Sequence, residues 1–321
     1  MGTFDRNSKN INVYSQLGIL LAMVGAGLVI GSIVSVVLWL IMTGRPLLEM
    51  ETDMFLPKYY NSVMVIQVVS TFFLFFLPVY FTAFICYRKP ARFMGFNRNI
   101  NYRQVLLVLF ILLLTFPLSA ALGELNKMIP IPKKWADYFQ TKEDARTAEE
   151  AALIQINSFS KYLASLVVIG LLPGLFEEVG FRSGLQNILV RWFKGPWAAI
   201  ILTSIIFSLF HYSYYGFLVR FALGVILGFI FFYSENIWLG VLLHFLFNAL
   251  QVTALYLTTL PTPKGQKDLG EDFPWWLGVV SLVLIVYLFK EFKKTSLRQR
   301  AKVNDDDWPD DDFQNWAISP S

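Results

Sequence analysis

Residues 105–122 read VLLVLFILLLTFPLSAAL, a run that contains no charged side chain and is long enough to cross a bilayer as an α-helix. In hydrocarbon every backbone polar group must be bonded within the protein, which favours a helix for such a run. Seven other stretches are also mostly apolar and about as long, although one is short and one is polar in its second half. The eight predicted spans are residues 17–42, 62–86, 105–122, 160–190, 198–212, 217–233, 237–257 and 275–289. We therefore predict an all-α fold, a polytopic transmembrane helix bundle of about eight spans, with seven to nine as the range.

The composition supports this class of protein. Of the 321 residues, 55% are hydrophobic and 16% are charged, and the mean hydropathy is +0.52. A soluble domain carries about 25% charged residues, so this chain lacks the charge that a water-facing surface needs. Its net charge of +4 comes from basic residues clustered beside the spans, which argues against a nucleic-acid-binding stripe. The single cysteine, Cys86, excludes an internal disulfide and a multi-cysteine metal site.

The predicted orientation rests on basic residues in short loops, which collect on the cytoplasmic side of a membrane. The loop after the second predicted span has no acidic residue and carries Arg88, Lys89, Arg92, Arg98 and Arg103. Basic residues return after the fourth and the eighth spans, on the same side if the chain crosses eight times. We therefore predict an integral, multi-pass membrane protein with both termini in the cytoplasm, in the cell membrane if the source is prokaryotic. The first apolar run is too long for a signal-peptide core and is expected to be retained.

The predicted spans divide the chain into five regions. These are a three-span N-terminal region (1–122), an extracytoplasmic loop with a surface helix or loop (123–159), a core (160–257), the last span with its preceding loop (258–290) and a cytoplasmic tail (291–321). The tail is first basic and then acidic, and its acidic end is expected to be disordered. No internal repeat is evident, which argues against the many transporter folds that are built from repeated halves.

Charged residues inside a span are costly and usually serve a polar site or one another. The second half of the fourth predicted span contains three of them close together, Glu177, Glu178 and Arg182. Residues four apart share a helix face, so Glu178 and Arg182 are expected to form an ion pair. Glu177 is rotated by about 100° from Glu178 and is left to face something else. The alternative is a purely structural network of all three charges, although buried pairs add little net stability.

The only two histidines also lie in predicted spans. Phe207 and His211 are four residues apart and share a helix face, although a histidine near the end of a span can equally be interfacial and inert. His244 and Asn248 are also four apart and project together from an apolar helix. Their side chains either act as donors in a polar site or form interhelical hydrogen bonds. Such bonds stabilise membrane bundles by about 0.6–2 kcal/mol each.

Taken together, these groups are the ones needed to activate water and to stabilise an oxyanion. A glutamate can accept a proton from water. Imidazole and amide donors can hold the negative oxygen of a tetrahedral intermediate, where the loss of one donor costs about 3–4 kcal/mol. The sequence therefore predicts a polar site between the late helices of the bundle.

Three motifs follow one another in this part of the chain: Glu-Glu-x-x-x-Arg at 177–182, Phe-x-x-x-His at 207–211 and His-x-x-x-Asn at 244–248. In this order they resemble the CPBP intramembrane proteases, which include type II CaaX prenyl endopeptidases, Abi proteins and bacteriocin-processing proteins. The resemblance covers roughly residues 160–252. It implies that Glu177 is the general base that activates water with the help of His211, and that His244 and Asn248 form the oxyanion hole. Glu178, Arg182 and Phe207 are then supporting residues.

The resemblance leaves the use of a metal open, because the family has been described both as metalloproteases and as glutamic proteases. Glu177, His211 and His244 could supply ligands to zinc and leave a position for water. The helical His-Glu-x-x-His signature is absent, and we favour catalysis without a cofactor.

The expected partners are the lipid bilayer and a membrane-associated peptide or protein substrate, with prenylated CaaX proteins as one class and no nucleic acid. One alternative is a non-enzymatic membrane immunity or scaffold protein that uses the same polar cluster for binding and packing. A weaker alternative is a small transporter with a proton-coupled Glu177.

Overall fold

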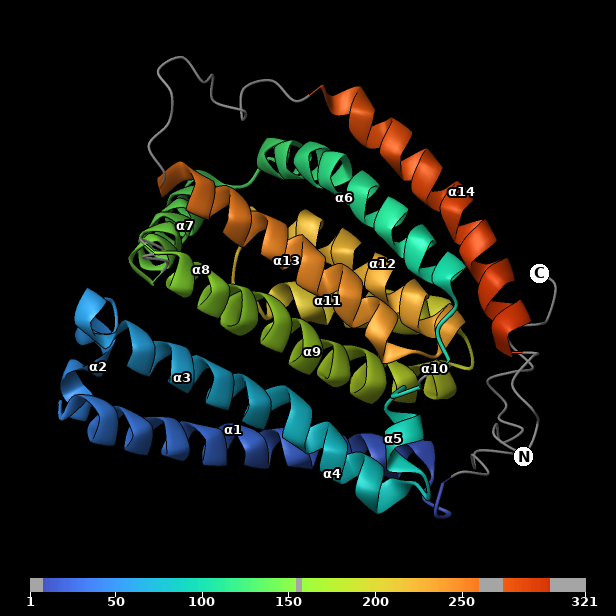
Figure 1. Ribbon diagram of the computed structural model, residues 1–321, viewed down its shortest axis with the longest axis horizontal. Coiled ribbons are helices and arrows are strands. Elements are labelled where there is room, and N and C mark those ends of the chain that lie inside the picture. Colours follow the sequence, from blue (N-terminus) through green and yellow to red (C-terminus); the bar gives the residue numbers. More distant parts are fainter. Residues whose placement is uncertain (1–7, 98, 154–157, 260–273, 301–321) are drawn as a thin grey trace.

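The computed structural model describes residues 8–97, 99–153, 158–259 and 274–300, and within these ranges the chain forms helices and turns with no β-strand (Figure 1). The α-helices are α1 (Val13–Thr43), α2 (Met50–Asp53), α3 (Tyr60–Thr71), α4 (Leu77–Cys86), α5 (Pro90–Phe93), α6 (Tyr102–Met128), α7 (Lys133–Leu153), α8 (Phe159–Ser165), α9 (Leu172–Glu178), α10 (Asn187–Phe193), α11 (Pro196–Leu209), α12 (Phe217–Ser234), α13 (Ile237–Thr259) and α14 (Trp275–Arg300). Two short 3-10 turns, η1 (Leu47–Glu49) and η2 (Pro57–Tyr59), precede α2 and α3. The all-α prediction is confirmed.

Several of these helices join end to end through π-helical turns. The π segment η3 (Phe72–Phe76) connects α3 to α4, η4 (Leu166–Leu171) connects α8 to α9, and η5 (Val179–Gln186) connects α9 to α10. As a result, Phe159–Phe193 is one continuous helix of 35 residues. A π turn contains one more residue than an α turn, and such turns are frequently found at functional sites.

Among the described residues, seven helices are long and apolar enough to cross a membrane. The predicted fifth span, residues 198–212, is the exception, because α11 has only 14 residues. At about 1.5 Å per residue it is about 21 Å long, shorter than the roughly 30 Å of hydrocarbon in a bilayer. The chain nevertheless reverses direction through α11 between α10 and α12 (Figure 1). The cytoplasmic location of the termini stays a prediction, and the acidic end of the tail lies outside the described residues.

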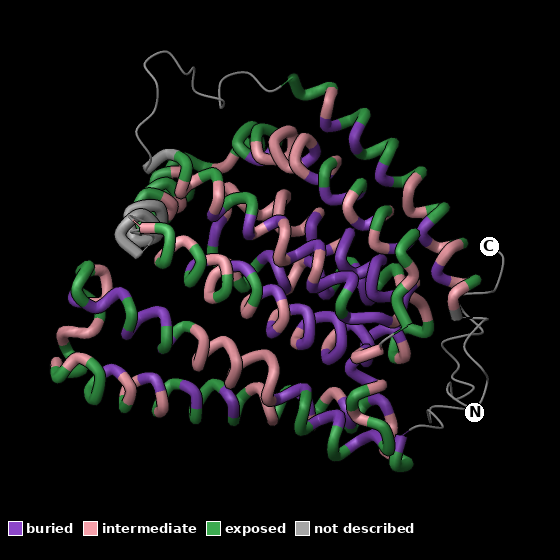
Figure 2. Tube along the Cα trace, in the orientation of Figure 1, coloured by how far each residue is buried: buried purple, intermediate pink, exposed green. Residues whose placement is uncertain are grey.

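The helices are arranged in layers (Figure 1). The hairpin of α1 with α3–α4 lies on one side, the continuous helix α8–α10 lies next to it, and α6 packs against α14 on the opposite side. Between these layers, α12 and α13 are the most buried spans, and Figure 2 shows buried residues concentrated there and along α9–α10. The outer helices expose apolar side chains, as expected where lipid is the solvent.

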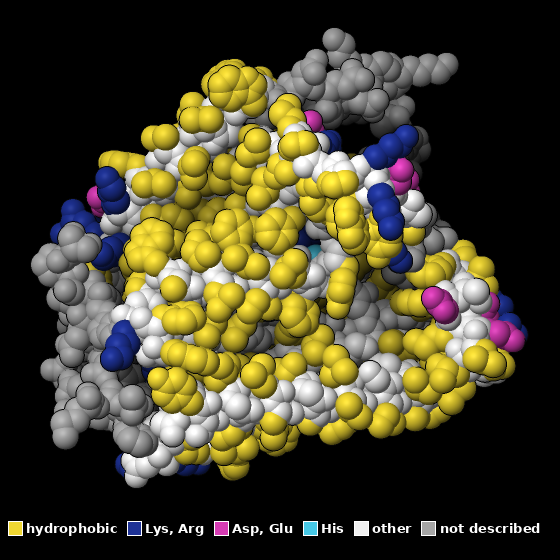
Figure 3. All heavy atoms as spheres, turned by 180° about the vertical axis from the view of Figure 1, so that it is seen from behind, with side chains coloured by type: hydrophobic (Ala, Val, Ile, Leu, Met, Phe, Trp, Pro, Cys, Tyr) yellow, Lys and Arg dark blue, Asp and Glu magenta, His cyan; other side chains and the backbone are white. Residues whose placement is uncertain are grey.

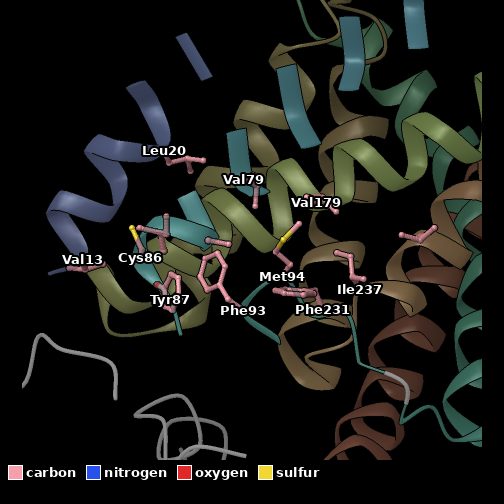
Figure 4. Close-up of a cluster of buried hydrophobic side chains, with 13 residues drawn as sticks. Val13, Leu20, Val79, Cys86, Tyr87, Phe93, Met94, Val179, Phe231 and Ile237 are labelled. Atoms are coloured by element: carbon pink, nitrogen blue, oxygen red, sulfur yellow. The ribbon is translucent and has the colours of Figure 1, made fainter. Parts of the chain in front are cut away.

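One cluster of buried side chains ties the N-terminal hairpin to the late helices (Figure 4). It includes Cys86 at the end of α4, Tyr87 directly after it, Met94 after α5, and Ile237 at the start of α13. Two hydrogen bonds reinforce it: Ser183 Oγ donates to Met94 O over 2.6 Å, and Asn187 Nδ2 donates to Phe93 O over 3.0 Å. Cys86 is therefore a packed core residue.

Candidate active site

The two adjacent glutamates lie at the C-terminal end of α9, where the helix changes into the π segment η5. Glu178 is fully buried, and its Oε2 accepts from Arg182 Nε over 3.2 Å, with both side chains 0% exposed. This is the pair that the spacing predicts. Gly240 of α13 lies against the same carboxylate, since a Cβ at Gly240 would be 2.9 Å from Glu178 Oε2. The absence of a side chain there lets α13 approach Glu178.

His244 on α13 lies between the two glutamates. Its Nδ1 is 3.2 Å from Glu178 Oε1, and its Nε2 is 4.0 Å from Glu177 Oε2. A carboxylate that is ionised and paired with arginine can only accept a hydrogen bond, so Nδ1 of His244 carries a hydrogen. Its other ring nitrogen, Nε2, therefore faces Glu177.

Glu177 differs from Glu178 in its surroundings. Its side chain is 16% exposed, and its buried Oε2 has no hydrogen-bond partner among the described residues. Arg220, in the first turn of α12, adds a positive charge that acts on Glu177 electrostatically. Of the two carboxylates, Glu177 is thus the one that remains available to a water molecule or a substrate.

Phe207 forms a common wall for the site. Its ring lies edge-on to both histidines, with centroid distances of 4.9 Å to His211 and 5.9 Å to His244. The guanidinium of Arg182 lies over the same ring at 5.1 Å, and cations are attracted to aromatic faces at this range. Phe207 is 1% exposed. Its ring therefore packs against three polar side chains at once and helps to fix their positions.

His211 is not on a helix, which corrects the predicted span of 198–212. The helix α11 ends at Leu209, and His211 is the second residue of the turn that leads to α12. Its Nδ1 is 2.8 Å from Phe207 O, and because a carbonyl only accepts, Nδ1 is the donor. The predicted contact between Phe207 and His211 is present all the same, because Phe210 and His211 continue the helical direction through backbone hydrogen bonds to Ile206 O and Ser208 O.

Asn248 is placed less closely. It lies one turn beyond His244 on α13 and is partly exposed. Its side chain forms no hydrogen bond or ion pair with another of the residues that the structure describes. The structure therefore brings together Glu177, Glu178, Arg182, Phe207, His211 and His244, and leaves Asn248 on the same helix face as His244.

No group of three or more His, Cys, Asp or Glu side chains within the described part of the chain is close enough to hold a metal ion. His211 directs its Nδ1 to the backbone, and His244 directs its Nδ1 to Glu178. The zinc alternative would therefore require His211 and His244 to bind the metal through Nε2. Activity measured with and without a chelator tests this alternative.

The site reaches the apolar surface of the molecule. Figure 3 shows histidine atoms at the bottom of a hollow in an otherwise hydrophobic face, beside atoms of a basic side chain. Aromatic rings stand next to the site on the side of the N-terminal hairpin. The ring centroid of Phe181 is 5.2 Å from that of Phe75, in η3, and 5.7 Å from that of Phe210. A bound molecule would meet both apolar walls and the polar groups, which is typical of ligand sites.

Fold and site together define an integral, multi-pass membrane protein with an acid–imidazole site enclosed by its late helices. Residues 159–250 match a family model described as Rce1-like, type II CAAX prenyl endopeptidase Rce1-like. The match runs from α8 into α13 and contains every residue of the site, so the resemblance to the CaaX-type membrane proteases is confirmed over this segment, which indicates a peptide hydrolase. No curated protein and no solved structure matches the chain.

Sequence reasoning missed three features of the site. The contact of Glu178 with His244 joins residues 66 positions apart, and no local spacing indicates it. The sequence around Gly240 does not indicate its role either, because that role is to leave space for the Glu178 carboxylate on another helix. Arg220 had a signal that was overlooked, namely a charged residue inside a predicted span.

Proposed function

We propose that the protein is an intramembrane endopeptidase that hydrolyses a peptide bond of a membrane-associated protein or peptide, with prenylated CaaX-type proteins as one substrate class. The observation that carries the proposal is the position of Glu177. Its buried Oε2 has no hydrogen-bond partner among the described residues and is 4.0 Å from Nε2 of His244. A carboxylate in this position can accept a proton from a water molecule that is held between it and the imidazole.

In the proposed reaction, water gives a proton to Glu177, with His211 assisting, and the resulting hydroxide attacks the carbonyl carbon of the scissile bond. The negative oxygen of the tetrahedral intermediate accepts hydrogen bonds from His244 and Asn248. The C–N bond then breaks, and the proton held by Glu177 passes to the departing amine. Water and a peptide bond thus yield one carboxylic acid and one amine, and the general base returns to its starting state.

Glu178 has a defined part in this scheme. For His244 to donate through Nε2, its ring must carry hydrogens on both nitrogens and is then cationic. Glu178 is 3.2 Å from Nδ1 and balances that charge, while Arg182 keeps Glu178 ionised and oriented. Contacts of this kind orient and polarise the groups that act on the substrate.

The test uses the purified full chain and a small library of membrane-associated peptides, prenylated and unprenylated, with and without a chelator. Glu177→Gln removes the base, and Glu124→Gln is the matched control, because Glu124 is an exposed glutamate paired with Lys127. We expect cleavage by the native protein and by the control, in the presence of chelator, and none by Glu177→Gln. Cleavage by Glu177→Gln would overturn the glutamate mechanism. Loss with chelator and recovery with zinc would assign the reaction to a metal.

The enclosed ion pair favours one other function. Glu178 and Arg182 are completely buried and bonded to each other, as they would be in a membrane immunity or scaffold protein that uses the cluster only for packing. That alternative predicts that folded site variants keep the biological phenotype and that no peptide of the library is cleaved by any variant.

A further inference from the structure

The turn that carries His211 is held by helices outside the segment that matches the protease family. Asn126, near the end of α6, forms two hydrogen bonds across this turn. Its Nδ2 donates to Tyr214 O over 3.0 Å, and its Oδ1 accepts from Leu218 N over 2.9 Å. Asn126 is 1% exposed, so this amide closes the start of α12 against α6.

The helix α7 holds the same turn from another direction. The carboxylate of Glu143 accepts from Ser213 Oγ over 2.8 Å, and Ser213 Oγ in turn accepts from Gly216 N over 3.1 Å. The ring of Phe139 stacks on that of Tyr214 with centroids 4.7 Å apart and an interplanar angle of 9°. Phe139 and Glu143 are four residues apart, so both contacts come from one face of α7.

The turn needs such support because of its backbone conformation. Tyr212, the residue after His211, has a φ of +50° and a side chain that is 89% exposed. A non-glycine residue in this left-handed region is strained, and strained residues persist only where the surrounding structure holds them in place. Asn126, Phe139 and Glu143 supply that restraint within a few residues of the imidazole.

We propose that α7 positions His211, with Glu143 and Phe139 as positioning residues that act through Ser213 and Tyr214. The inference rests on the proposed function, because positioning matters to turnover only if His211 assists in it. It extends the site to a helix that precedes the family match, in the region predicted from sequence only as a surface helix or loop. A charged residue of α7, Glu143, thereby becomes part of what determines the rate.

The first experiment measures the restraint without any substrate. Diethyl pyrocarbonate modifies accessible imidazole, and mass spectrometry reports the rates at His211 and at His244, which is 3% exposed and serves as the internal reference. We expect Glu143→Ala and Phe139→Ala to raise the rate at His211 about fivefold. Glu143→Gln keeps an acceptor for Ser213 and is expected to stay close to native, as is Asp137→Ala on the exposed face of α7. Equal rates in all variants would overturn the proposal.

The second experiment measures turnover. Glu143→Ala is expected to lower kcat about five- to tenfold, the size of effect expected from the loss of one typical hydrogen bond, with KM nearly unchanged and Glu143→Gln restoring most of the rate. In a His211→Gln background the same change should cause no further loss, because the residue through which α7 acts is already gone. A further loss there would contradict positioning through His211.

These two experiments separate the possible failures. If labelling of His211 responds as expected but His211→Gln leaves turnover unchanged, the restraint by α7 stands and the role of His211 in the proposed function fails. If turnover depends on His211 but neither labelling nor kcat responds to Glu143→Ala, the proposed function stands and the role of α7 fails.

Discussion

The imidazole of His244 donates through Nδ1 to Glu178 and thereby turns Nε2 toward Glu177, 4.0 Å away. One residue of the adjacent glutamate pair fixes the ring, and the other faces its remaining nitrogen. This arrangement gives the two carboxylates different parts, although they are neighbours in the chain and chemically identical. The predictions below test those parts one at a time.

Glu177→Gln should leave the protein folded and abolish turnover. The amide cannot accept a proton from water, and general-base catalysis is worth about 10²- to 10⁴-fold in rate. Peptide cleavage measures the loss, and the thermal unfolding midpoint in detergent serves as the folding control. A variant that retains native turnover would show that Glu177 is not the base.

Glu178→Ala should destabilise the protein by about 3–5 kcal/mol, since removal of one partner leaves the buried Arg182 without its counter-charge. Equilibrium unfolding in mixed micelles measures the change. The matched control is Glu124→Ala, which removes an exposed pair worth about 1 kcal/mol or less. If the two variants lose the same amount, the Glu178–Arg182 pair contributes no more than a surface pair.

Gly240→Ala should impair both folding and turnover. Its new methyl group would be 2.9 Å from Glu178 Oε2, so the carboxylate or α13 must shift, and overpacking of this kind costs about 1–3 kcal/mol. Gly18→Ala is the control, because a Cβ at Gly18 meets nothing within 4 Å. Unfolding and cleavage measured side by side check the prediction, and a Gly240→Ala protein with native values for both would contradict it.

Asn248→Ala should reduce kcat without reducing stability. No hydrogen bond to another described residue is lost in the resting protein, whereas an oxyanion donor is worth about 10²- to 10³-fold in kcat. Asn248→Asp tests the same point with a side chain that no longer donates and should be equally slow. Native rates in both variants would remove Asn248 from the oxyanion hole.

The sequence predicted most of the fold, because transmembrane helices depend on local composition. The composition of a run such as 105–122 predicts a spanning helix without any knowledge of the rest of the chain. Seven of the eight predicted spans have a matching helix of full length. The fifth predicted span runs past the end of α11 and includes His211, because hydropathy does not indicate the residue at which a helix ends. The three π segments could not be predicted either, since each depends on how neighbouring helices pack.

The residues of the site were found in sequence because charge and imidazole are conspicuous in apolar spans. The contacts between these residues could be predicted only in part. The pair of Glu178 with Arg182 follows from a spacing of four residues, whereas the contact of Glu178 with His244 depends on how α13 crosses α9. The contact of Glu143 with Ser213 joins positions 70 apart, one of them in a segment where sequence could not decide between helix and loop.

The π segment after Glu178 works as a phase shift along one continuous helix. Its extra residue turns everything downstream by about 100° relative to an unbroken α-helix. Before the shift, Glu177 and Glu178 face the site, and after it Ser183 and Asn187 face the chain around α5, where they bond to Met94 O and Phe93 O. A single helix can therefore serve chemistry at one depth of the membrane and anchor the N-terminal hairpin at another. Deletion of one residue within 179–186 would restore an ordinary helix. The glutamates could then face the site only if Ser183 and Asn187 turned away from the chain around α5.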